Sequence, residues 1–384
     1  MATQSPPASL EAIRWRRPRL SILDQLLLPH TSTYVDIRSS ADGHRAIATM
    51  QTRGAPAIAI VAALSLAAEL LDPESPLPDK EGDRARVIEA RLDYLATSRP
   101  TAVNLFDAVR KLKAVVQGAP QELCADVVAA YVAAAEAMLK DDVADNRAIG
   151  RLGAQFIASR HGASGLGVLT HCNTGALATA GHGTALGIVR TLHEENGLDH
   201  VYFTETRPYN QGARLTAYEL LAERIPATLV CDSAVSALLR AQPGIKAVVV
   251  GADRVARNGD TANKIGTYQL AIAARFHGRD FIVAAPTTSI DNSLQDGTEI
   301  AIEERAQDEV LVTHGVAVDK LMNNSEVERA AVRVAPLGAQ AWNPSFDVTP
   351  AHLITAIVTE RGVYVRADGA AEFDLTGPPP SSVA

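Results

Sequence analysis

Residues 246–253 read KAVVVGAD, an apolar run of strand length that ends in a glycine, an alanine and an aspartate. Similar runs recur beyond residue 165, with helical stretches between them: LGVLTHC (166–172), VYFTET (201–206), ATLVCDS (227–233) and FIVAAPTT (281–288). Unbroken apolar strands separated by helices are typical of βαβ units, whose parallel sheet is buried on both faces. We therefore expect an α/β protein with a Rossmann-like domain over residues 146–370.

The chain before this domain reads mainly as helices, because apolar residues recur there at helical spacing. These stretches are residues 55–71, 87–98, 102–116 and 122–157. We expect a mainly helical N-terminal domain over residues 13–145, preceded by a disordered lead (1–12). Residues 371–384 are low in apolar side chains and predict a disordered tail. Two domains also agree with the length of 384 residues, since single cores rarely exceed roughly 250–300 residues.

Composition excludes several classes of protein. The formal charge of -8 argues against a nucleic-acid binder, which needs a basic face. The most apolar stretch, residues 55–71, contains Glu69 and is shorter than the ~20 residues of a membrane span. Three scattered cysteines without a Cys-x-x-Cys pair suggest neither a disulfide framework nor zinc, so we expect no metal and a reducing compartment. Cytoplasmic residence follows, with a nuclear pool left open.

Ligands of open parallel sheets bind beyond the carboxyl ends of the strands, where strand order reverses. Cys172 ends one predicted strand, and a Gly175 turn and an Ala-rich helical stretch follow it. Backbone N–H groups at such a turn favour an anion or a thiolate. The alternative, that Cys172 is a small buried hydrophobe, has about equal weight.

Asp253 ends the quoted strand and precedes a loop rich in glycine, asparagine and aspartate. A carboxyl at the mouth of an apolar sheet loses solvation, which favours its protonated form and a role as general acid. A turn aspartate is the plain alternative. Asn263 and Lys264 favour the first interpretation, because an amide and an ammonium at a predicted helix N-terminus suit a phosphate or a sugar hydroxyl.

Two arginines precede predicted helix starts. Arg53 and Gly54 come just before Pro56 in TRGAPAIAI, and Arg99 lies between a candidate cap, Ser98, and Pro100. Such starts can clamp a phosphate, although a single arginine is more often a surface ion pair. Gln211, in YNQGARL, offers an amide to a sugar hydroxyl, which ordinary turn chemistry would also explain. The segment GHGTALG has the wrong spacing for a dinucleotide fingerprint, so no nicotinamide or flavin is expected.

Seven motifs in this order resemble the methylthioribose-1-phosphate isomerase family of methionine salvage. They are TRGAPAIAI, SRPTAVNL, THCNTGALAT, ETRPYNQGARLTAYEL, GADRVARNGDTANKIGTY, FIVAAP and DGTEIAIEER. The resemblance spans about Ile13 to Asp368. It implies a catalytic cysteine at Cys172 and a catalytic aspartate at Asp253. It also implies that the substrate-binding residues are Arg53, Gly54, Ala55, Arg99, Gln211, Asn263 and Lys264.

The same resemblance implies an aldose-ketose isomerase that acts on a sugar phosphate without a cofactor, as a homodimer. Two alternatives stay open. Regulatory subunits of the guanine-nucleotide exchange factor of translation initiation share the domain plan but generally lack the paired THCNTG and GADRV motifs. An isomerase of another ribose phosphate would need a further cation for a second phosphate.

Overall fold

The computed structural model describes residues 10–75, 83–100, 102–119, 124–318, 329–367 and 369–379. The chain divides into two compact units. Unit 1 consists of Met1–Leu27, Ser32–Ala148 and Thr174–Gly183, and unit 2 of Leu28–Thr31, Ile149–Asn173 and Thr184–Ala384. The residue limits that we predict for the two domains stay predictions. Segment 174–183, inside the predicted second domain, is part of unit 1.

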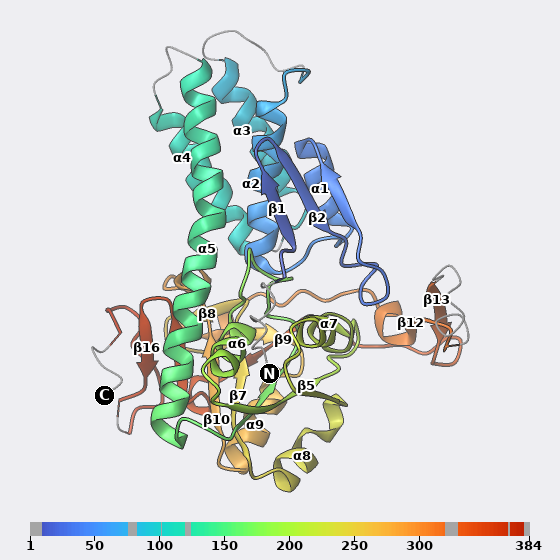
Figure 1. The fold of residues 1–384 in the computed structure, drawn as a ribbon, viewed down its shortest axis with the longest axis vertical. Helices are drawn as coiled ribbons and strands as arrows, with labels where there is room; N and C mark the ends of the chain where they lie inside the picture. The colour runs from blue at the N-terminus through green and yellow to red at the C-terminus, as the bar shows by residue number, and fades with distance from the viewer. Residues whose placement is uncertain are drawn as a thin grey trace, which may run out of the picture. The chain divides into compact units, whose positions relative to one another are not determined.

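Unit 1 combines helices with a small sheet, and the mainly helical N-terminal domain is confirmed (Figure 1). Its helices are α1 (Ser40–Ala48), α2 (Ala55–Leu71), α3 (Asp83–Ala96), α4 (Val103–Gly118) and the first part of α5 (Cys124–His161). Its antiparallel strands are β1 (Ile13–Arg16), β2 (Arg19–Leu23) and β3 (Tyr34–Ile37). We did not predict these strands, because four or five residues are too few for a clear alternating pattern.

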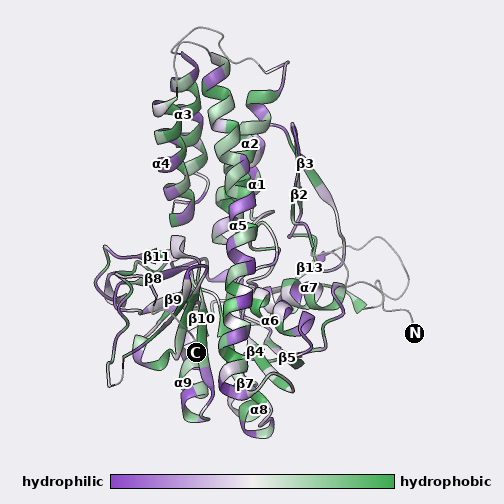
Figure 2. Cartoon of the chain, turned by 60° about the vertical axis from the view of Figure 1, so that its left-hand side comes forward, coloured by the Kyte–Doolittle hydropathy of each residue, from purple (hydrophilic) through white to green (hydrophobic). Residues whose placement is uncertain are grey.

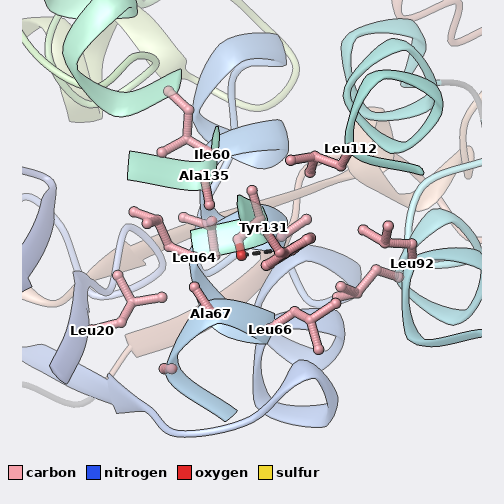
Figure 3. Packing of buried hydrophobic residues seen from close by; sticks show 14 of the residues in the cluster. Leu20, Ile60, Leu64, Leu66, Ala67, Leu92, Leu112, Tyr131 and Ala135 are labelled. Carbon is pink, nitrogen blue, oxygen red and sulfur yellow. Dashed lines mark hydrogen bonds between the residues drawn. The ribbon is translucent and has the colours of Figure 1, made fainter. Parts of the chain in front are cut away.

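Helix α2 is the centre of the unit 1 core. Its side chains are buried from Ala57 to Leu70, and Figure 2 shows it hydrophobic along its length. Even Glu69 is buried, where it accepts a hydrogen bond from the Ser40 amide and pairs with Arg91. Tyr131 of α5 donates its hydroxyl to the Ala63 carbonyl, among leucines of the same core (Figure 3). Within the described residues, no helix has the length and apolarity that a membrane crossing requires.

Unit 2 contains the predicted Rossmann-like sheet. The strand order is β16-β15-β10-β7-β4-β5-β6, and all pairs are parallel except β15–β16. The predicted strands are β4 (Leu166–Thr170), β5 (Leu198–Thr204), β6 (Ala227–Val230), β7 (Ile245–Val250) and β10 (Asp280–Ala284), and β15 (Ala356–Thr359) and β16 (Gly362–Val365) extend the sheet.

The KAVVV segment (residues 246–250) shows why helices cover both faces of this sheet. Ala247 and Val249 pack into one apolar cluster with the end of α5 and α6 (Ala185–Glu194). Val248 and Val250 pack into a second cluster with α8 (Val235–Ala241) and α9 (Thr267–Phe276). Because successive strand residues point to opposite faces, a strand covered by helices on both sides must be apolar throughout.

A second sheet lies at residues the sequence patterns did not assign to strands. Its order is β11-β8-β9-β14, with β8 (Arg254–Ala256) and β9 (Thr261–Lys264) forming a hairpin, and β11 (Ile290–Asp291) and β14 (Phe346–Thr349) outside them. A separate hairpin consists of β12 (Val312–Val316) and β13 (Arg329–Arg333).

The described part of the tail departs from the expected disorder. Phe373 and Leu375 are buried in the core of unit 2, and the Phe373 amide donates to the Asn258 carbonyl. Tyr364 also donates its hydroxyl to Gly377. Buried side chains and hydrogen bonds together hold the described part of the tail against unit 2. Residues 1–9 and 380–384 lie outside the described residues.

Candidate active site

Cys172 and Asp253 follow neighbouring strands at the point where strand order reverses. The chain continues from β4 to β5 and β6 on one side of the sheet, while β7 pairs with β4 on the other. Cys172 comes two residues after β4, and Asp253 three residues after β7. Both therefore lie beyond the carboxyl ends of adjacent parallel strands, where open α/β sheets bind ligands.

Hydrogen bonds hold the Cys172 backbone on both sides. Its amide donates to Thr206 Oγ1 at 2.9 Å, and its carbonyl accepts from Thr216 Oγ1 at 2.5 Å. Cys172 has φ of +65° and Thr206 has φ of +62°. The left-handed region is uncommon for non-glycine residues and unfavourable for a β-branched one, so this backbone persists because its surroundings hold it.

Gln211 precedes a single π-helical turn, Gly212–Thr216. Gln211 is 5% exposed, and its Oε1 atom has no hydrogen-bond partner among the described residues. A Cβ on Gly212 would lie 1.7 Å from the Thr204 carbonyl oxygen, so only glycine permits this approach. Isolated π turns occur often at functional sites, and here one begins directly after a predicted binding residue.

Asp253 lies against the strand that carries Asn263 and Lys264. Its amide donates to the Ala262 carbonyl at 2.9 Å. The Asn263 side chain donates to Thr267 Oγ1, and Lys264 donates to the Ser345 carbonyl at 2.9 Å. The placement of Asn263 and Lys264 at a helix N-terminus was wrong. They lie on β9, because β14 pairs with this segment, and α9 begins only at Thr267.

A carboxylate already occupies the N-terminus of α9. Asp347 of β14 accepts from the amides of Gly266 and Tyr268, at 2.7 and 3.1 Å. Burial raises the pKa of Asp347 to about 6, while these two hydrogen bonds and Lys264 oppose the shift. This helix start therefore has an internal anion, which disfavours its use as a phosphate site.

A buried ion-pair network fixes Asn173, the residue after Cys172. The Asn173 side-chain Nδ2 donates to Glu219 Oε1 at 2.7 Å, and Glu219 pairs with Arg190 at 2.6 Å. Arg190 also pairs with Glu223 at 2.6 Å. Because breaking a buried pair leaves an uncompensated charge, the position of Asn173 is strongly determined.

In unit 1, the Arg53–Gly54–Ala55 segment packs against segment 174–183. Gly54 has φ of +100°, and a Cβ there would lie 2.3 Å from the Ala178 carbonyl oxygen. The Ala57 amide, in the first turn of α2, donates to the same oxygen. Pro56 occupies the first turn of this helix as predicted. Segment 174–183 follows Cys172–Asn173 along the chain, so the predicted phosphate clamp contacts the continuation of the cysteine loop.

Arg99, the other arginine predicted to bind phosphate, does not lie at a helix start as expected. Ser98 does not cap α4: its hydroxyl donates to the Leu95 carbonyl, and the helix begins at Val103 with Ala102 as its cap. The reason is that the segment after Ser98 first forms a turn, closed by the Ala102 amide donating to the Arg99 carbonyl. Arg99 thus precedes a turn rather than a helix start. The binding roles of Arg53 and Arg99 stay predictions.

The sequence patterns missed His171, Thr204 and Thr206. The position of His171, directly before Cys172 at a strand end, could have indicated a role in the site. Nothing in the local sequence marks a threonine that will adopt positive φ. Among the described residues, no three His, Cys, Asp or Glu side chains gather so that they could hold a metal ion.

Comparison with known proteins identifies the family. The model of the initiation factor 2 subunit family matches residues 51–365. A methylthioribose-1-phosphate isomerase of Coccidioides posadasii is 53% identical over 378 residues, which cover 96% of each chain. The isomerase of Zea mays is 51% identical over 372 residues, 96% of this chain and 97% of that one. The chain belongs to the methylthioribose-1-phosphate isomerase branch of this family. It is an enzyme of the isomerase class, as the resemblance implied.

Solved structures agree on the fold. The 5-methylthioribose 1-phosphate isomerase of Pyrococcus horikoshii matches with a TM-score of 0.81 and 34% identity, covering 92% of both chains. A protein described as translation initiation factor eIF-2B, subunit delta, from A. fulgidus matches with a TM-score of 0.77 and 33% identity, covering 93% of this chain and 96% of that one. The methylthioribose-1-phosphate isomerase family thus shares its fold with initiation-factor subunits, and fold alone does not separate the two functions.

Proposed function

We propose that the chain converts 5-methylthioribose 1-phosphate to 5-methylthioribulose 1-phosphate in methionine salvage, with Cys172 and Asp253 as its catalytic residues. The observation that carries the proposal is their placement after the adjacent strands β4 and β7, where strand order reverses. The names of the relatives at 51–53% identity support the substrate.

The chemistry of the substrate explains why an acid is needed. Phosphate on the anomeric oxygen prevents the ring from opening to a free aldehyde as ordinary aldoses do. The C1–O bond of the ring must break, and the ring oxygen must take up a proton. Asp253 supplies this proton as a general acid. The product gains a C1–H bond and an O–H bond at the former ring oxygen, and it loses the hydrogens of C2 and of the C2 hydroxyl, so atoms balance without an external oxidant or reductant.

Two routes carry hydrogen from C2 to C1. In the first, Cys172 removes the C2 proton and returns it to C1 through an enediol. In the second, hydride moves directly from C2 to C1, and Cys172 stabilises the charge that develops. Cys172 is 5% exposed, and a site that excludes water strengthens either form of electrostatic stabilisation.

The remaining predicted residues bind the substrate. Gln211, with its unpartnered Oε1, accepts a hydrogen bond from a sugar hydroxyl, and Asn263 and Lys264 contact the sugar phosphate. Arg53, Arg99 and the backbone at Gly54 and Ala55 bind phosphate, as the family resemblance implies. No cofactor takes part in this scheme.

The test is conversion of methylthioribose 1-phosphate by the purified chain, beside Cys172→Ser and Asp253→Asn. Matched controls are Cys231→Ser and Asp199→Asn, because both residues are exposed. The proposal expects turnover by the parent and both controls, and loss of at least about a hundredfold in the two site variants, the scale of general acid–base catalysis. Substrate deuterated at C2 separates the routes: complete retention of the label at C1 excludes an enediol that exchanges with water.

A second candidate is a non-catalytic subunit of a translation-initiation exchange factor, favoured by the 33% identity with the A. fulgidus protein. A folded parent without turnover on this substrate would favour that role, or an isomerase of another ribose phosphate. We also propose a homodimer, which sedimentation as a monomer would contradict. We further propose cytoplasmic residence, and imaging of a tagged chain tests this and decides whether a nuclear pool exists.

A further inference from the structure

His171 connects the end of β5 with the segment after β9, two parts of unit 2 that are far apart in sequence. It is 1% exposed. Its Nδ1 lies 2.5 Å from Thr204 Oγ1, and its Nε2 lies 2.9 Å from the Ile265 carbonyl oxygen. A Cβ on Gly266 would come within 3.1 Å of the His171 ring. The imidazole thus fills the space between the last residue of β5 and the residues directly after Lys264.

The partners fix the tautomer of this ring. A carbonyl oxygen only accepts, so Nε2 must carry the proton and donate to Ile265. Nδ1 is then the acceptor, and the Thr204 hydroxyl donates to it. Burial lowers the pKa of His171, and Lys264 lowers it further, while the Ile265 hydrogen bond and Asp232 oppose the shift. The neutral ring with one defined tautomer agrees with these contacts.

The hydrogen bonds continue from Thr204 to Cys172. Since the Thr204 hydroxyl donates to His171, the Thr206 hydroxyl is the donor toward Thr204, whose Oγ1 lies at 3.3 Å and whose carbonyl oxygen lies at 3.4 Å. Thr206 Oγ1 in turn accepts from the Cys172 amide. Asp232 holds this loop from outside, accepting from the amides of Thr206 and Arg207 at 2.8 and 2.7 Å. A continuous chain therefore runs from Ile265 through His171, Thr204 and Thr206 to the backbone of Cys172.

We propose that His171, Thr204 and Thr206 are positioning residues, which set the backbone of Cys172 and tie it to the Asn263–Lys264 strand. The proposal rests on the proposed function, because it assumes that Cys172 reacts. None of the three needs to touch the substrate. They act by keeping Cys172 in a left-handed conformation and by fixing Ile265, the residue after Lys264.

Three buried threonines give a matched test. Thr170, Thr204 and Thr206 are all at most 1% exposed, and Thr→Val keeps shape while it removes the hydroxyl. The Thr170 hydroxyl has no hydrogen-bond partner among the described residues, so Thr170→Val is the control. Because an unsatisfied buried group costs enough to change a rate about tenfold or more, Thr204→Val and Thr206→Val are expected to lower kcat at least about tenfold. Thr170→Val is expected to retain kcat.

The histidine is tested by rescue. Glutamine can still donate to the Ile265 carbonyl in place of Nε2, whereas alanine cannot, so His171→Gln is expected to recover a substantial part of the kcat that His171→Ala loses. Hydrogen exchange of residues 261–268 should be faster in His171→Ala than in the parent and slower again in His171→Gln. All variants are compared where circular dichroism shows them folded.

A readout without turnover separates this proposal from the proposed function. The rate of Cys172 alkylation, with the exposed Cys231 as internal reference, is expected to change about tenfold in Thr206→Val and to stay constant in Thr170→Val. Equal kcat values and equal alkylation rates in all three valine variants would overturn the positioning role. The parent could lack turnover while the Cys172 alkylation rate still changes in Thr206→Val and not in Thr170→Val. In that case the proposed function fails, but Thr206 still positions Cys172.

Discussion

The Cys172 amide donates to the Thr206 hydroxyl across 2.9 Å, and both residues have positive φ. Each conformation costs on the order of 1–3 kcal/mol. The hydroxyl of one strained residue thereby holds the strained backbone of the other. Residues beyond β4 and β5 thus hold each other in conformations that neither would adopt alone, which is how a folded chain maintains a demanding local geometry.

Gly54→Ala should destabilise unit 1 by about 3 kcal/mol, because positive φ and the close Ala178 oxygen both oppose a side chain. The measurement is urea unfolding followed by circular dichroism. Gly118→Ala is the control, since Gly118 ends α4 with nothing within 4 Å of a new Cβ. It should be neutral or stabilising by about 0.5–1 kcal/mol. Equal effects of the two variants would refute the role of the Ala178 contact.

Asp142→Asn should change how stability depends on pH. Burial raises the pKa of Asp142 to about 7, although it accepts from the Ala180 amide at 2.7 Å and from Asn146 at 2.9 Å. A raised carboxyl pKa means that the folded state binds the extra proton, so stability is greatest at low pH and falls as pH rises through about 7. Between pH 7.5 and 5.5 the parent should gain roughly 2 kcal/mol from this group, and Asp142→Asn should lack that gain in urea unfolding.

His171 should act in the opposite direction. Its pKa lies below the ordinary 6.5 because of burial, so the unfolded chain takes up a proton that the folded chain resists. The stability that this group contributes is present above pH 6.5 and is lost as pH falls toward the folded pKa. This loss should be measurable by comparing urea unfolding at pH 7.5 and pH 5.5. His171→Gln should remove it, and an unchanged acid limb of the stability curve would contradict the prediction.

Glu219→Gln should cost about 3 kcal/mol or more, because Arg190 would stay buried with one carboxylate fewer. The exposed pair of Arg110 and Asp107 is the control, and Arg110→Met should change stability by less than about 1 kcal/mol. Both are measured by urea unfolding at pH 7.5. Similar costs would show that burial does not determine the strength of these pairs.

Phe373→Ala should loosen the turn between β8 and β9. Phe373 is buried, and its ring packs where a Cβ on Gly259 would lie. Removing it should cost about 3 kcal/mol and speed hydrogen exchange at residues 256–260. Leu337→Ala, at a residue that is 89% exposed, should change stability by no more than about 0.5 kcal/mol. Unaltered exchange at the turn would show that the tail does not support it.

The sequence predicts the central sheet because the information is local. Each of the five predicted strands contains a short run of apolar residues, and in KAVVV alternate residues pack on the two faces of the sheet. The placement of Cys172 and Asp253 follows, since any chain that leaves adjacent parallel strands starts at the same edge.

The features that the sequence patterns did not predict depend on contacts with residues that are distant in sequence. The NKIG segment resembles a helix start until β14, some eighty residues later, pairs with it. Asp347 occupies the α9 N-terminus from the same strand. Likewise, Cys172 and Asp232 hold Thr206 at positive φ through hydrogen bonds, and no pattern around residue 206 records these contacts.

The pairing of β9 with β14 also orders events in time. A ribosome adds about 5–20 residues per second, so β14 is synthesised on the order of ten seconds after the strand that carries Asn263 and Lys264. During that interval β9 has no strand on one edge, and the N-terminus of α9 lacks Asp347. The nascent chain can complete the helical unit early, but its Asn263–Lys264 strand takes its final form only when translation is nearly finished.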